Sequence, residues 1–151
     1  MICIMLVVAV VTTPGTSMAS VKMEPLARTA PPPVEFKIQG SFDPSNSYLD
    51  QGTATISDNG NQTVKISVIT EAKSSVASIG GTVYLQKWTG TQWINVGSAS
   101  TISASNDWYF SGEVVKPAEQ GYYFRARVVH WINHNGVYEQ GETTSDSRLV
   151  S

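Results

Sequence analysis

Short alternating and β-branched runs dominate the chain from Val34 onward, and clusters of Gly, Asn, Asp and Ser separate them. No stretch of about 11 residues has the 3.6-residue apolar period of an amphipathic helix. Runs bounded by turn residues in this way are typical of strands. The pattern therefore predicts an all-β domain with eight strands, at residues 34–41, 52–57, 62–71, 78–88, 93–102, 108–115, 121–132 and 142–150.

The first predicted hairpin turns at Asp58-Asn59-Gly60. A two-residue Asn-Gly turn would place the apolar residues of its two strands on opposite faces. A three-residue loop with Gly60 in the left-handed conformation places them on one face, so burial favours this form. It pairs Ile56 with Gln62 and Ala54 with Val64.

The second predicted hairpin turns at residues 89–92. If Trp88 faces Trp93, then Leu85 faces Val96 and Val83 faces Ser98. One face then carries a predicted core of Val83, Leu85, Ile94 and Val96. The other face carries the aromatic residues Tyr84, Trp88 and Trp93 among polar side chains.

Residues 121–131 alternate strictly between the two faces of a predicted strand. Tyr122, Phe124, Ala126 and Val128 are predicted to fill the core, while the residues between them face outward. A Gly-Tyr-Tyr sequence opening a late, long strand is similar to the tyrosine corner of immunoglobulin-like domains, although their paired cysteines are absent. We therefore expect a single antiparallel β-sandwich of immunoglobulin-like type, with a small closed barrel as the alternative.

Several of these motifs together resemble a family of small secreted proteins from Bacillota that has no assigned function. The resemblance covers roughly residues 50–150 and rests on Leu85-Gln86-Lys87-Trp88, Gly90, Trp93, Val96, Gly121-Tyr122-Tyr123-Phe124-Arg125-Ala126-Arg127 and His130. It implies a signal peptide, a short spacer and one β domain. It implies no catalytic residues.

The amino-terminal region has the pattern of an export signal. An almost unbroken apolar run, Ile2 to Val11, is too short to span a bilayer, and small residues at Ser17 and Ala19 precede a predicted cut at Ser20. We therefore predict a signal peptide at residues 1–19, a Pro-rich linker at 20–34 and a β-sandwich domain at 35–151. The single cysteine, Cys3, would leave with the signal, so the mature domain would have no disulfide.

Charge excludes two classes of partner. Ten basic residues are scattered among twelve acidic ones, for a net charge of −2. Binding to nucleic acid or to an anionic membrane needs a dense basic face. We therefore expect a secreted protein with no nucleic-acid partner and no membrane contact after signal cleavage.

Four potential metal ligands lie close together in the sequence: His130, His134, Glu139 and Glu142. The two histidines would share a face at a four-residue spacing on a helix, but here the first lies at a strand end and the second in a turn. Ordinary surface or half-buried histidines explain the pattern better, so no metal and no cofactor is predicted. No nucleophile motif is present, and no pair of carboxylates stands out, so we expect no catalytic residues.

The aromatic face is the strongest functional signal. Aromatic rings stack against sugars or anchor protein partners, although cross-strand packing also accounts for them. The predicted function is a non-catalytic binding or surface-interaction module for a glycan, a cell-wall polymer or a protein. One alternative is self-assembly into an extracellular fibre through strand pairing by residues 34–38, and a less favoured one is a small secreted hydrolase. The candidate binding residues are Tyr84, Trp88, Trp93, Tyr123 and Trp131.

Overall fold

The computed structural model describes residues 26–34 and 40–151, and this part of the chain contains seven strands and no helix. This confirms the all-β prediction. The signal peptide predicted at residues 1–19, residues 20–25 of the predicted linker and residues 35–39 lie outside the described part. The strands are β1 (Gly40–Ser41), β2 (Leu49–Asp58), β3 (Thr63–Trp88), β4 (Trp93–Pro117), β5 (Tyr123–His134), β6 (Val137–Thr144) and β7 (Arg148–Leu149).

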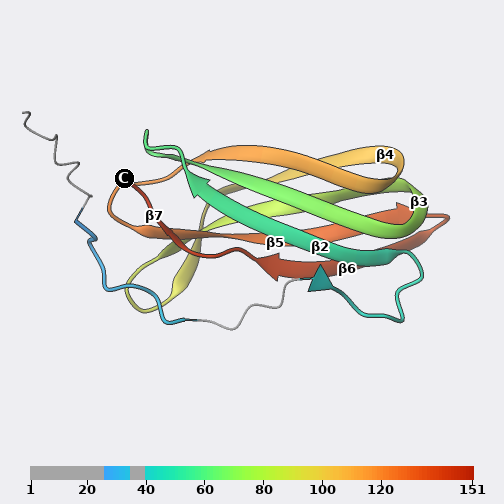
Figure 1. Ribbon diagram of the computed structural model, residues 1–151, viewed down its shortest axis with the longest axis horizontal. Coiled ribbons are helices and arrows are strands. Elements are labelled where there is room, and N and C mark those ends of the chain that lie inside the picture. Colours follow the sequence, from blue (N-terminus) through green and yellow to red (C-terminus); the bar gives the residue numbers. More distant parts are fainter. Residues whose placement is uncertain (1–25, 35–39) are drawn as a thin grey trace, which may run out of the picture.

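Two very long strands, β3 and β4, create the layered architecture. They pair antiparallel along most of their length, and this ribbon bends back on itself at one end of the molecule (Figure 1). The first half of β3 also pairs with β2, whereas its second half pairs with β5. The antiparallel sheet therefore curls into two facing layers, as in a sandwich.

Layer A contains β1, β2, the first half of β3 and the second half of β4. Layer B contains the first half of β4, the second half of β3, and β5, β6 and β7. Both layers turn apolar side chains toward each other. The largest of these buried apolar side chains are Leu49, Ile66, Ile79, Leu85, Phe124 and Ile132.

The prediction of four separate strands at 62–71, 78–88, 93–102 and 108–115 was wrong, because these segments form only β3 and β4. The register shifts between Glu71 and Val76, where the ribbon bends. Residues 73–75 are exposed there. Polar exposed residues at a bend have the composition of a turn, yet the backbone stays extended through them.

The first hairpin differs from its predicted register. Ile56 pairs with Ile66 rather than Gln62, and Ala54 pairs with Val68 rather than Val64. Gly60 is left-handed as expected, with φ +71°, but Gln62 also has a positive φ and the connection is longer. The shift is an even number of residues, so the apolar side chains still share one buried face.

The second hairpin matches its prediction near the turn. Trp88 pairs with Trp93 and Leu85 with Val96, but Val83 pairs with Ser100 rather than Ser98. A bulge at Gly97, whose φ is +69°, accounts for this difference. Ile94, predicted to be core, is 39% exposed, so the core does not extend to the hairpin end of β4.

Of the core residues predicted from residues 121–131, Phe124, Ala126 and Val128 are buried, whereas Tyr122 is only half-buried and packs against the core from its side. The last predicted strand, at 142–150, was wrong in its bounds. A tight Asn135-Gly136 turn, with both residues at positive φ, starts β6 at Val137, and β7 follows separately. The Asn135-Gly136 pair is a typical hairpin-turn sequence, but the residues after it are mostly polar and lack the apolar alternation that would have predicted β6.

The edge of the sandwich beside β2 and β6 is closed by side chains. The carboxylate of Glu139 accepts hydrogen bonds from the backbone amides of Tyr48, at 2.9 Å, and Leu49, at 2.7 Å. Phe42 packs so closely over Gly141 that a Cβ there would lie 2.3 Å from its ring. The loop before β2 is thereby held against β6.

The segment at residues 26–34 lies along the end of the sheet. The amide of Arg28 donates to the carbonyl of Gly121 at 2.8 Å, and its side chain forms an ion pair with Glu119. The indole of Trp88 donates to the carbonyl of Ala30 at 3.1 Å. Within residues 26–34 and 40–151 no helix is long and apolar enough to cross a bilayer.

Candidate functional site

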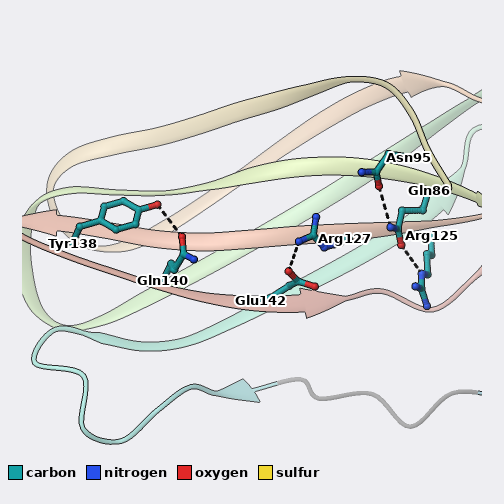
Figure 2. A network of polar contacts seen from close by, with 7 residues as sticks. All are labelled: Gln86, Asn95, Arg125, Arg127, Tyr138, Gln140 and Glu142. Atoms are coloured by element: carbon teal, nitrogen blue, oxygen red, sulfur yellow. Dashed lines mark hydrogen bonds and ion pairs between the residues drawn. The ribbon is translucent and has the colours of Figure 1, made fainter. Parts of the chain in front are cut away.

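The outer face of layer B carries all five aromatic residues predicted as a binding site. Strand alternation turns Tyr84 and Trp88 of β3 outward, together with Tyr123 and Trp131 of β5. Trp93 of β4 joins them because it pairs with Trp88. These residues share a face with a series of polar side chains, which Figure 2 shows from close by.

At one end of this face lie the two tryptophans. The rings of Trp88 and Trp93 are 5.3 Å apart, and the guanidinium of Arg125 lies 4.4 Å from the centre of the Trp93 ring. Gln86 accepts a hydrogen bond from Arg125 at 2.8 Å (Figure 2). Trp88 is only 6% exposed, so its ring is packed against the protein and offers no surface to a ligand.

In the middle of the face, an arginine is held between a ring and a carboxylate. The guanidinium of Arg127 lies 5.1 Å from the centre of the Tyr84 ring and 2.6 Å from Glu142. The hydrogen bond that Arg127 donates to Glu142 raises the pKa of Arg127, which stays charged. Ring and carboxylate together fix the orientation of the guanidinium.

At the other end, Trp131 and Tyr138 form an aromatic pair. Their rings are 6.5 Å apart and inclined by only 20°, and Tyr138 is 56% exposed. The Tyr138 hydroxyl points toward Gln140, 3.4 Å away (Figure 2). This pair therefore offers a ring surface to solvent.

A shallow hollow of about 480 Å³ lies between this aromatic pair and the Arg127–Glu142 pair. Small-molecule sites in proteins usually enclose about 300–1,000 Å³. Its lining combines a ring, a guanidinium, a carboxylate, an amide and a hydroxyl. The lining residues are Thr82, Tyr84, Arg127, Val129, Tyr138, Gln140, Gly141 and Glu142.

The five predicted residues share a face but do not form one compact site. Trp131 lies eight positions after Tyr123 on β5, which corresponds to about 26 Å along a strand. Of the five, only Tyr84 lines the hollow, and Trp131 supports it through Tyr138. The other three lie at the tryptophan end.

Sequence reasoning missed Tyr138 and Gln140. Both lie on β6, whose start was placed too late, so their alternation with Glu142 was not recognised. The Asn135-Gly136 turn was the signal that could have extended the strand back to Val137.

His130 lies in the core and not at the surface. It is fully buried, with its Nδ1 atom 2.7 Å from the hydroxyl of Thr70 and its Nε2 atom 2.7 Å from that of Thr143. Thr70 donates its only hydroxyl hydrogen to the carbonyl of Gly80, so it accepts from Nδ1–H. Nε2 is then the acceptor, and the ring is neutral. Burial lowers the pKa of His130 to about 4.

The other three potential metal ligands, His134, Glu139 and Glu142, each have a different hydrogen-bond partner. His134 accepts a hydrogen bond from the amide of Ala77 at 3.0 Å. Glu139 holds the amides before β2, and Glu142 binds Arg127. Among the described residues no three His, Cys, Asp or Glu side chains come together as metal ligands would.

The comparisons with known proteins give no relative. No family model, no curated protein and no solved structure matches the chain.

Proposed function

We propose that the protein is a secreted, non-catalytic binding module, and that a neutral glycan binds in the hollow on the outer face of layer B. The observation that carries this proposal is the exposed Tyr138 ring beside the Arg127–Glu142 pair across an open hollow. Secretion is proposed from the apolar run at the amino terminus.

The mixed chemistry of the hollow supports a sugar over other ligands. Sugar hydroxyls both donate and accept hydrogen bonds, and the lining supplies a donor in Arg127, an acceptor in Glu142 and both in Gln140. The apolar face of a sugar ring can stack on Tyr138. A protein partner would instead need a wider surface with an apolar centre.

The charges of the hollow favour a neutral ligand. Arg127 and Glu142 are 2.6 Å apart and neutralise each other, so the hollow has no excess charge to attract a polyanion. This agrees with the net charge of −2 for the chain.

The count of carboxylates in the hollow favours binding over hydrolysis. Glycoside hydrolysis generally uses two carboxyl groups on either side of the bond that breaks. Glu142 is the single carboxylate among the described residues that line the hollow. It already accepts a hydrogen bond from Arg127 at 2.6 Å.

Binding of soluble oligosaccharides tests this proposal. The purified protein would be titrated with hexasaccharides of β-linked glucose, β-linked N-acetylglucosamine and α-linked glucose. Tryptophan emission is a suitable signal because Trp131 lies directly against Tyr138. We expect at least one sugar to bind, and Tyr138→Ala and Glu142→Gln each to weaken binding by tenfold or more.

The opposite outer face provides matched controls. Tyr109 lies on layer A and is 38% exposed, and Lys65 and Glu113 form an ion pair there at 3.1 Å. Tyr109→Ala and Glu113→Gln should leave glycan affinity unchanged. If no sugar binds at millimolar concentration, or if the layer A variants weaken binding equally, the proposal fails.

A further inference from the structure

A second concave site lies at the free edge of the sandwich, away from the outer face of layer B. Because β4 bends back with the ribbon, its two halves form the edges of both layers. Near the hairpin end the layers part and leave a small cleft of about 170 Å³. Its lining residues are Leu85, Val96, Gly97, Ser98, Lys116 and Pro117.

The cleft contains a buried cation. Lys116 pairs with Val64 on the inner face of layer A, and only 8% of the residue is exposed. Its ammonium donates to the carbonyl of Ser98 at 2.7 Å and to the hydroxyl of Ser100 at 2.9 Å. Both partners are neutral, and burial lowers the pKa of Lys116.

An ammonium group has three hydrogens, and these two bonds use two of them. Within residues 26–34 and 40–151, no carboxylate forms an ion pair with Lys116. A buried charge without a counter-charge is costly. The cleft therefore favours a negatively charged group beside Lys116.

The backbone at the cleft is shaped by the β4 bulge. Leu85 pairs with Val96 but Val83 pairs with Ser100, so β4 has two extra residues there. The bulge depends on Gly97, whose φ of +69° disfavours other residues although the space around it is open. It brings the Ser98 carbonyl to Lys116, and bulges commonly redirect groups in this way near functional sites.

The remaining lining is apolar. Leu85 and Val96 form one wall of the cleft, and Ile94 shares the face of Val96 and is 39% exposed. Another cation on the inner face of layer B, Lys87, is already bound to Glu119 at 2.6 Å. One available positive charge beside an apolar wall matches a ligand with one negative charge and a short hydrocarbon tail.

We propose that this cleft binds a monocarboxylate with a short aliphatic chain. The carboxylate lies against the Lys116 ammonium, and the chain lies along Leu85, Val96 and Ile94. This site is independent of the glycan hollow, because the cleft opens at the β4 edge and its lining shares no residue with the hollow.

Titration calorimetry with butyrate, hexanoate and octanoate tests the proposal, with octanol as the uncharged probe. Affinity should rise about threefold to fourfold for each added methylene group. Octanol should bind at least tenfold more weakly than octanoate. Lys116→Met should lose octanoate binding by tenfold or more, whereas Lys65→Met, on the outer face of layer A, should not.

Two further measurements keep the proposal testable if Lys116→Met does not fold. Val96→Phe fills the cleft and leaves the ammonium in place, so it should also weaken octanoate binding by tenfold or more. In the unaltered protein, octanoate should raise the pKa of Lys116 measured by NMR. Absence of octanoate binding, equal binding of octanol, or an unchanged affinity in Val96→Phe would overturn the proposal.

Discussion

Acidification should destabilise this protein before its carboxylates protonate, and the cause is His130. Its ring is fully buried and neutral between Thr70 and Thr143. The pKa is about 4 in the folded protein, against 6.5 for an ordinary histidine. The unfolded chain therefore binds more protons than the folded one between these two values.

The sign and size of the effect follow from this difference. Stability from the neutral ring is fully present above pH 6.5 and is lost as the pH falls toward 4. The loss in the free energy of unfolding is about 2 kcal/mol by pH 5 and about 3 kcal/mol by pH 4. Hydrogen bonds lower the pKa values of Glu113 and Glu119, so these carboxylates contribute to acid unfolding only below about pH 4.5. The interval from pH 7.5 to 5 therefore isolates the histidine.

Urea unfolding followed by tryptophan fluorescence at several pH values measures this effect. The unaltered protein and His134→Gln should lose about 2 kcal/mol between pH 7.5 and 5, with the urea dependence of the free energy unchanged. His130→Gln should be less stable at pH 7 but nearly flat over the same interval. A flat profile in the unaltered protein, or an undiminished slope in His130→Gln, would refute the reasoning.

Three further predictions concern the scaffold. Gly52→Ala should lower the free energy of unfolding by about 1–3 kcal/mol in urea, because its Cβ would lie 2.6 Å from the His130 ring; a neutral result contradicts this packing. Glu139→Gln should speed hydrogen exchange at the amides of residues 47–49 by about tenfold, because these amides lose a charged acceptor. Unchanged exchange would show that the carboxylate does not hold these amides. Gly136→Ala should cost about 1 kcal/mol in thermal unfolding, since its φ is +78° while the surrounding space is open; a gain in stability would contradict the turn geometry.

Alternation of apolar residues predicted which side chains are buried, because a strand has a strict two-residue period. Phe124, Ala126 and Val128 are buried as expected. The same rule could not fix the first hairpin, because registers that differ by an even number of residues bury the same face. The actual register pairs Ile56 with Ile66 and depends on a loop conformation that Gln62 adopts at positive φ.

The local pattern of apolar and polar residues did not predict how the long strands pair and bend. Residues 73–75 have the composition of a turn, yet β3 continues through them and bends the ribbon into two layers. The aromatic face of layer B was predicted correctly as a face. The sequence did not predict that this face divides into a packed tryptophan end and an open hollow. This division depends on contacts between distant segments: Trp88 donates a hydrogen bond to Ala30, and Tyr138 stacks on Trp131.

The most direct test of the glycan proposal is to map the bound sugar on the protein by NMR. With the tightest-binding hexasaccharide, backbone and side-chain shifts should concentrate at Thr82, Tyr138, Gln140 and Glu142, on the outer face of layer B. The amide of Tyr109, on the opposite face, should not move. Shifts confined to layer A or to the Trp88–Trp93 end, or no shifts with any of the three sugars, would contradict the account.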